Sequence, residues 1–206
     1  MEIIQSDERR EPMSGSSIAT RKALCETMKQ LMCEKSFNTI SVKSVCESCG
    51  INRKSFYYHY RDKFDLVNDI YHLEFYDTAV KAYRNDIMGF IEALCSDLAE
   101  NKKFYRNAFN VEGQNAFKDS FCDSLAPVIE RHLIRHDFRD SDAKVLAKYY
   151  AVMLSSAMTY WLGEKNRMSA QSFAQCMKSI SAGILDDGIR IRNYAGTSAA
   201  AAYAYN

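Results

Sequence analysis

The chain of 206 residues contains only two prolines and eight glycines, the two residue types that most often interrupt helices. No apolar run reaches the roughly 18 residues that a membrane-spanning helix requires. No stretch alternates between apolar and polar residues with the period of two that is typical of strands. These absences predict an all-α fold that does not enter a membrane.

The charge and the cysteines exclude two further classes of protein. The formal net charge is only +1, so the chain as a whole is not a polybasic binder. The seven cysteines are odd in number, lack the spacing of a disulfide framework and follow no apolar signal segment. We therefore expect a reduced protein in the cytoplasm.

Motifs for catalysis are also missing. The sequence has no Walker loop, dinucleotide-binding glycines or His-Glu-x-x-His motif, and no Gly-x-Ser-x-Gly elbow. Cys46 and Cys49 have the spacing of half a zinc site, but no second pair completes it, and we interpret them as small buried residues. His132 and His136 lie i, i+4 among arginines at a helix end, which favours a solvated pair. We expect no enzyme, no catalytic residue, no metal site and no cofactor.

The basic residues are concentrated near the beginning of the chain. Residues 16–63 carry nine Lys and Arg against four Asp and Glu, a net charge of +5, whereas residues 64–206 carry a net charge of −2. A basic N-terminal segment followed by a slightly acidic remainder is typical of a DNA-binding module joined to a domain with another function.

Residues 40–66 are the most informative segment. Ser41 is a suitable N-cap for a helix whose apolar residues recur at i, i+3 and i+4. Gly50 can adopt the left-handed backbone that ends this helix in a tight turn, and Asn52 can cap a second helix that continues through His59. Two short helices around a glycine predict a helix-turn-helix, whose second helix enters the major groove of DNA.

The sequence patterns divide the whole chain into four parts. Residues 1–15 are polar and without pattern, which predicts a disordered arm; residues 16–63 form the DNA-binding domain; residues 64–194 form a helical domain for effector binding and dimerisation; and the low-complexity residues 195–206 form a flexible tail. The expected helices are residues 16–35, the two short helices of the helix-turn-helix, and residues 63–84, 86–100, 102–109, 113–134, 141–163 and 169–191.

Residues 145–162 have one charge and are apolar on nearly every side. A surface helix presents a polar face, so this helix must be covered from several directions. In a chain of this size, its own domain covers one side and a second subunit covers the other. The pattern predicts a homodimer, the commonest symmetric assembly.

Residues 50–66, GINRKSFYYHYRDKFDL, resemble the corresponding run of the TetR family of bacterial transcriptional regulators. Residues 149–184 resemble the TetR-like C-terminal domain of a subgroup that includes activators of dihydroxyacetone kinase operons. The resemblance implies a three-helix N-terminal DNA-binding domain, joined by a long helix to a C-terminal helical bundle that dimerises. It also implies binding to near-palindromic double-stranded DNA.

The same resemblance implies which side chains contact DNA. Arg53, Lys54 and Tyr58 correspond to positions that read or approach bases in the family. The positions that hold phosphates correspond to Ser41, Lys43, Ser55, Tyr57, His59 and Lys63.

Two hypotheses for the function follow. The first is a dimeric, sequence-specific DNA-binding transcriptional regulator, a repressor that a small-molecule effector releases from DNA. The alternative is a TetR-like co-regulator whose C-terminal domain docks a partner protein instead of a small ligand. An internal cavity of a few hundred Å³ favours the sensor of small molecules, and a core filled by side chains favours the partner protein.

Overall fold

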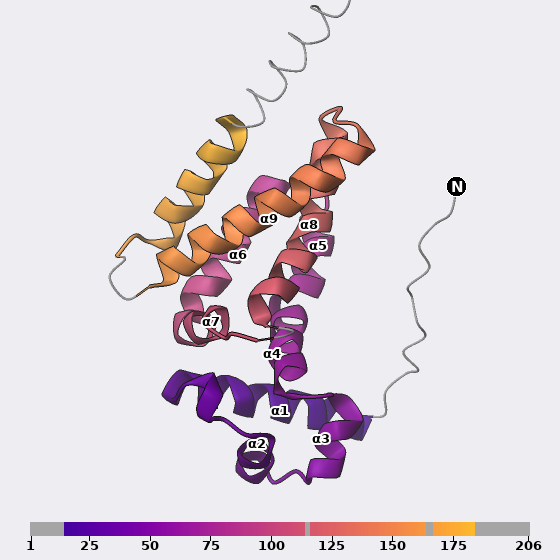
Figure 1. Cartoon of the computed structure of the whole chain (residues 1–206), viewed down its shortest axis with the longest axis vertical. Helices are drawn as coiled ribbons and strands as arrows, with labels where there is room; N and C mark the ends of the chain where they lie inside the picture. The colour runs from indigo at the N-terminus through magenta and orange to yellow at the C-terminus, as the bar shows by residue number, and fades with distance from the viewer. Residues whose placement is uncertain (1–14, 114–115, 164–166, 184–206) are drawn as a thin grey trace, which may run out of the picture. The chain divides into compact units, whose positions relative to one another are not determined.

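The computed structural model describes residues 15–113, 116–163 and 167–183 (Figure 1). These residues form helices and their connections and contain no strand, which confirms the predicted all-α fold. Within the same ranges no helix combines the length and apolar character needed to cross a bilayer. The helices are α1 (Gly15–Glu34), a 3-10 turn η1 (Phe37–Thr39), α2 (Val42–Cys49), α3 (Arg53–His59), α4 (Lys63–Tyr71), a π-helical segment η2 (His72–Tyr76), α5 (Asp77–Ala82), α6 (Ile87–Glu100), α7 (Lys102–Phe109), α8 (Phe117–Arg135) and α9 (Asp140–Leu162).

Most predicted helices agree with these bounds to within a few residues. A further helix covers residues 170–183, inside the predicted 169–191, and its continuation lies outside the described residues. The predicted tail, 195–206, also lies outside them. So does the predicted N-terminal arm, apart from Gly15, which begins α1.

The expected single helix over residues 63–84 is one helical path of three segments. Between α4 and α5 the backbone widens into the π-helical segment His72–Tyr76, and α5 ends at Ala82. A π-turn contains one more residue per turn than an α-helix. The hydrophobic pattern of the sequence does not reveal it, because the apolar residues on both sides keep a helical spacing.

The chain divides into two compact units that are interleaved in the sequence. The first contains the residues up to Glu74 and the segment Lys103–Phe121, and the second contains Phe75–Lys102 and the residues from Cys122 onward. The first unit therefore includes the predicted DNA-binding domain, residues 16–63, together with α4, nearly all of α7 and the first turn of α8. The predicted domain limits describe an expected division of function, which remains a prediction.

The core of the first unit combines aliphatic side chains of the N-terminal helices with a cluster of aromatic rings. Tyr71 of α4 lies 5.8 Å from Phe117 and 5.2 Å from Phe121, measured between ring centroids. Phe109 of α7 lies 5.1 Å and 5.0 Å from the same two rings. The fully buried aliphatic residues that complete this core include Leu24, Met28, Met32, Ile40, Val45, Leu66 and Ile70.

Asn107 of α7 ties this segment to the end of α1. Its side-chain amide donates to the carbonyls of Met32, at 2.9 Å, and Lys35, at 2.7 Å. Its carbonyl oxygen accepts from the backbone N–H of Phe37 at 3.3 Å. The last carbonyls of a helix lack partners within the helix, so Asn107 completes the C-terminus of α1.

The second unit contains α5, α6, most of α8, α9 and residues 170–183. The side of α9 that faces this unit carries small residues, among them Ala143, Ala147 and Ala151, all fully buried. Such residues allow close approach of neighbouring helices. Trp161, near the end of α9, stacks on Phe173 with ring centroids 4.4 Å apart and donates to the carbonyl of Met168 at 2.9 Å.

The interpretation of His132 and His136 as a solvated pair is correct for one member only. His136 is exposed, but His132 is half-buried, and burial is the main cause of the lowered pKa of its imidazole. His132 lines a small, mostly apolar cavity of about 40 Å³. Among the described residues no group of three or more His, Cys, Asp or Glu side chains has an arrangement that could hold a metal ion.

Candidate nucleic-acid interface

Helix α2 begins with a reciprocal cap. The hydroxyl of Ser41 accepts from the backbone N–H of Ser44 at 3.0 Å, and the hydroxyl of Ser44 accepts from the N–H of Ser41 at 3.1 Å. A capping box normally uses Glu or Gln at this third position. Glu47 is too distant for that role, and Ser44 takes it instead, which the capping-box pattern does not predict. The Ser41 side chain remains exposed, so its hydroxyl proton is available for an external acceptor.

Gly50 and Asn52 make the turn that the sequence predicted. Gly50 has φ of 69°, in the left-handed region, and its N–H donates to the carbonyl of Cys46. Asn52 then accepts from the N–H of Ser55 at 2.8 Å and caps α3. The turn thus ends α2 and begins α3 within three residues, which is the geometry of a helix-turn-helix.

The two cysteines beside this turn lie in apolar and backbone surroundings. Cys46 is buried in the core, and burial raises the pKa of its thiol. Cys49 donates to the carbonyl of Val45 at 3.1 Å. The interpretation as a small buried residue is therefore correct for Cys46, whereas Cys49 is half-buried.

Helix α3 is divided into a buried and an exposed face. Phe56 is fully buried and anchors the helix in the core. On the other face lie Arg53, Lys54, Tyr57 and Tyr58, all exposed, with four-fifths of Tyr58 accessible to solvent. These side chains offer donors for base edges and phosphate oxygens, and α3 contains no carboxylate that would repel DNA.

Arg53 and Tyr57 support one another on this face. The Arg53 guanidinium lies 3.4 Å from the Tyr57 hydroxyl, to which it donates, and 5.9 Å from the centre of its ring. The hydrogen bond to Tyr57 raises the pKa of Arg53. An arginine partly oriented before binding loses less conformational entropy when it meets a base or a phosphate.

The other predicted contact residues of α2 and α3 are exposed to different extents. Lys43 is exposed and pairs with Glu47 at 3.7 Å, a weak surface pair that phosphate can replace. Ser55 and His59 are half-buried. Burial, with a further contribution from Arg21, lowers the pKa of His59, which favours a neutral ring with one donor and one acceptor.

Lys63 occupies a different environment from the other predicted residues. Its ammonium donates to the carbonyls of Phe37, at 2.9 Å, and Ile40, at 2.8 Å, and lies 4.1 Å from the centre of the Phe37 ring. Burial lowers its pKa. These contacts hold the start of α4 against the segment before α2. They favour a positioning role over the phosphate contact that the resemblance implied.

We expect Lys63→Met to destabilise the protein without changing the number of DNA phosphates that the protein neutralises. Losing two hydrogen bonds from a charged donor should cost about 1–3 kcal/mol of unfolding free energy, measured by urea denaturation. The slope of log affinity against log salt should change by less than about 0.5. Lys54→Met, at an exposed position, is the control and should reduce that slope by about 1. If both variants reduced the salt slope equally, Lys63 would be a phosphate contact as the resemblance implied.

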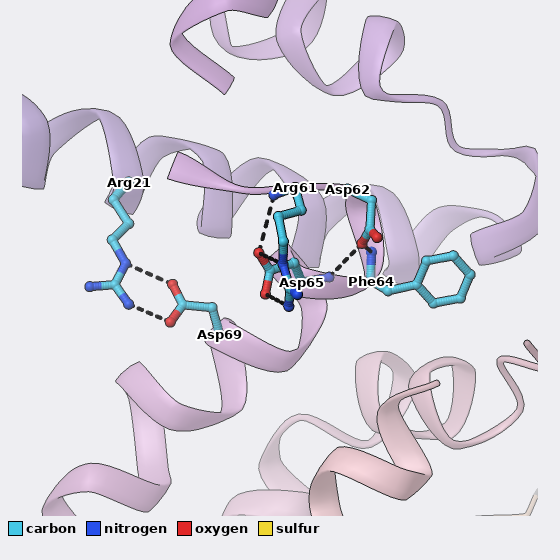
Figure 2. Close-up of polar contacts among 6 residues, drawn as sticks. All are labelled: Arg21, Arg61, Asp62, Phe64, Asp65 and Asp69. Atoms are coloured by element: carbon cyan, nitrogen blue, oxygen red, sulfur yellow. Dashed lines mark hydrogen bonds and ion pairs between the residues drawn. The ribbon is translucent and has the colours of Figure 1, made fainter. Parts of the chain in front are cut away.

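Four side chains that the sequence patterns did not predict hold α3 in place. Arg21 of α1 donates from Nε to Asp69 of α4 at 2.7 Å, and a second guanidinium nitrogen donates to the other carboxylate oxygen (Figure 2). Tyr60, the residue that follows α3, donates its hydroxyl to Asp69 at 2.7 Å, and the thiol of Cys25 lies 3.4 Å from that hydroxyl. We call Arg21, Asp69, Tyr60 and Cys25 the clamp.

The clamp connects the first helix, the end of the recognition helix and α4 through mostly buried groups. Only about a sixth of the Arg21 side chain and an eighth of the Asp69 side chain are exposed. Hydrogen bonding to Asp69 is the main cause of the raised pKa of Arg21, and burial raises the pKa of the Cys25 thiol to about 11. One signal was present in the sequence: Arg21 and Asp69 are charged residues that adjoin the apolar stripes of their helices.

The fold and this site together define a helix-turn-helix protein whose second short helix presents a basic, aromatic surface. Residues 85–183 match the family model TetR_C_8, described as a transcriptional regulator C-terminal region. The match lies in the part of the chain after the helix-turn-helix. A search of curated proteins found no match.

Three solved structures have the same fold. The dihydroxyacetone kinase operon activator DhaS is 18% identical, with a TM-score of 0.58, covering 84% of this chain and 98% of that one. A TetR-family regulator from Syntrophomonas wolfei is 13% identical, with a TM-score of 0.63 and coverages of 82% and 95%. NalD, the secondary repressor of the MexAB-OprM efflux pump in Pseudomonas aeruginosa, is 14% identical, with a TM-score of 0.57 and coverages of 78% and 93%.

Residues 85–183 are therefore a transcriptional regulator C-terminal region of the TetR type, and the chain has the fold of solved TetR-family regulators. Regulators of this family bind DNA, and the family is not enzymatic. The match confirms the resemblance inferred from the C-terminal half of the chain, whereas residues 50–66 lie outside the matched residues.

Proposed function

We propose that this protein is a dimeric regulator that binds a near-palindromic DNA operator through α3 and represses transcription until an effector releases it. The exposed basic face of α3, with Arg53, Lys54, Tyr57 and Tyr58, carries this proposal. Two copies of α3 about 34–36 Å apart would meet successive turns of one DNA face. An effector that prefers a dimer with another spacing would lower the affinity for the operator.

The exposed side of α9 supports the dimer. Large apolar side chains recur there over about four turns, and each is at least half exposed in the single chain. A contiguous apolar face of this length is typical of a protein–protein interface. Its residues are Val145, Tyr149, Val152, Met153 and Tyr160, which we call the apolar face of α9.

The partner-protein alternative is favoured by the small size of the apolar cavity that His132 lines in the second unit. The mostly apolar cavity beside His132 has a volume of about 40 Å³, enough for one or two water molecules. Sites for drug-sized ligands occupy about 300–1,000 Å³. A ligand of that size would enter this cavity only after the surrounding helices moved apart, whereas docking of a protein would not require it.

The experiment that tests the proposal is selection of genomic DNA fragments by the purified full-length protein, followed by footprinting. The proposal predicts a two-fold related sequence protected on one face of the duplex. Affinity should fall steeply with salt, because phosphate contacts release counterions. A protein that remains monomeric and selects no sequence would contradict the proposal. Screening small molecules for release of the bound fragment then separates the two kinds of regulation.

We expect Arg53→Ala to change sequence preference as well as affinity. Loss of a bidentate contact to a base costs about 1–3 kcal/mol at the contacted base pair, so the selected sequence should become degenerate at one position of each half-site. Lys144→Ala, which removes an exposed charge from α9, is the control and should retain the wild-type sequence. An unchanged preference for Arg53→Ala would remove this residue from base recognition.

A further inference from the structure

Three arginines of the second unit line one surface hollow. Arg131 and Arg135 lie i, i+4 on α8 and therefore point to the same side of that helix. Arg84 comes from the turn between α5 and α6. The hollow has a volume of about 540 Å³, and its other lining residues are Asn85, Pro127, Glu130 and Ile134. We call it the arginine hollow.

The elements that form the arginine hollow are held together by a defined contact. Tyr76, the residue before α5, donates its hydroxyl to the carbonyl of Ser124 on α8 at 2.8 Å. Both residues belong to the second unit, as do α5 and the part of α8 from Cys122 onward. The position of Arg84 near Arg131 therefore depends on packing within one unit and not on the arrangement of the two units.

The charges of these arginines are not neutralised within the part of the chain that the structure describes. Neither Arg84, Arg131 nor Arg135 has a hydrogen bond or ion pair to a described protein group, whereas Arg21, Arg61 and Arg139 are each paired with an aspartate. Glu130 is the one carboxylate among the residues that line the hollow.

The helix dipole explains only part of this arrangement. A cation at the C-terminus of a helix is favourable, which accounts for Arg135 in the last turn of α8. It does not account for Arg84, which belongs to another segment of the chain and faces the same space. Three guanidinium groups that converge on a hollow without carboxylate partners indicate a place for an external anion.

We propose that the arginine hollow binds a compact organic anion that carries two or more phosphate or carboxylate groups. Guanidinium groups bind both kinds of oxygen in a bidentate manner. The volume is within the range of small-molecule sites. Asn85 adds an amide for a hydroxyl or carbonyl group, and Pro127 and Ile134 supply apolar surface for a short carbon skeleton.

This site is independent of the DNA-binding proposal, because the anion binds the second unit and its binding is measured without DNA. The probes are pyrophosphate and citrate, which present the same charges on phosphate and carboxylate oxygens. Each is titrated calorimetrically into the full-length protein at constant ionic strength. We expect saturable binding of one anion per chain. The probe that binds with the higher affinity shows whether the hollow prefers phosphate or carboxylate groups.

The variants locate the binding. Arg84→Gln, and separately Arg131→Gln with Arg135→Gln, should each weaken binding by about tenfold or more, since each removes charge-assisted hydrogen bonds. All three positions are outside the core, so circular dichroism should remain that of the wild type. Lys144→Gln removes one exposed charge from α9 and should change the affinity by less than about twofold.

Three results would overturn the proposal. They are the absence of saturable binding for both probes, equal binding by the wild type and the arginine variants, and binding of a polyglutamate peptide without binding of either small anion. The second result would assign the anions to the basic N-terminal unit. The third would assign the hollow to an acidic segment of a partner protein.

Discussion

Asp69→Ala should lower the free energy of unfolding by about 2–4 kcal/mol, while Asp65→Ala should lower it by less than about 1 kcal/mol. Both changes remove an aspartate of α4 that is paired with an arginine (Figure 2). Both members of the Arg21–Asp69 pair are mostly buried. In the Arg61–Asp65 pair the arginine is largely exposed. Burial and not the presence of an ion pair should therefore determine the effect.

The large effect arises because Asp69 serves two donors of the clamp. Without it, the Arg21 guanidinium and the Tyr60 hydroxyl lose their shared acceptor in a region with little water. A buried charge left without its partner costs more than the pair contributed. Since Tyr60 directly follows α3, the recognition helix should also lose a fixed C-terminal end.

Urea denaturation measures both free energies, and a variant without either charge separates the contribution of the pair from the cost of its burial. Arg21→Met alone should destabilise the protein, because it leaves the Asp69 carboxylate mostly buried. The double variant Arg21→Met, Asp69→Leu should be more stable than Asp69→Ala, because neither charge remains. Similar losses for Asp69→Ala and Asp65→Ala would contradict a structural role for the clamp.

Val152→Asp should convert the protein to monomers and reduce its affinity for the selected operator by about 100-fold or more. The residue lies in the middle of the apolar face of α9 and is exposed in the single chain. In the proposed dimer an aspartate there would face another apolar surface, and burial of an unpaired charge is strongly unfavourable. A monomer binds one half-site and loses the contribution of the second.

Sedimentation gives the oligomeric state, and fluorescence anisotropy on a labelled operator gives the affinity. Thr78→Asp is the matched control, since it places the same charge at an exposed β-branched residue of α5. It should leave both quantities unchanged. If Val152→Asp remains dimeric and binds DNA like the wild type, the subunits do not pair through this face.

Local features of the sequence were sufficient to predict the helix-turn-helix. Ser41, Gly50 and Asn52 act on backbone groups within a few residues of themselves. Their identities therefore carry the information about where α2 and α3 begin and end. The exposed residues of α3 also follow from sequence, because Phe56 fixes which face is buried and the helical period determines the rest.

Contacts between distant residues were not predictable in the same way. Lys63 resembles a phosphate contact in the sequence, yet its ammonium binds carbonyls more than twenty residues away. Arg21 and Asp69 are 48 residues apart, and either could have pointed to solvent. The arginine hollow depends on a turn and a helix that meet only in the folded unit. A single sequence records the residues but not which of them meet.

The anchoring of Asn107 on the end of α1 has a consequence for protein engineering. A chimera that joins the helix-turn-helix of this protein to the sensory half of a relative, with the crossover after Glu74, would leave Lys103–Phe121 behind. The transplanted portion would then lack the amide for the carbonyls of Met32 and Lys35 and the rings that cover Tyr71. Exchange of specificity between relatives should succeed only if this downstream stretch is transferred too, or if recognition is altered by replacing surface residues of α3 alone.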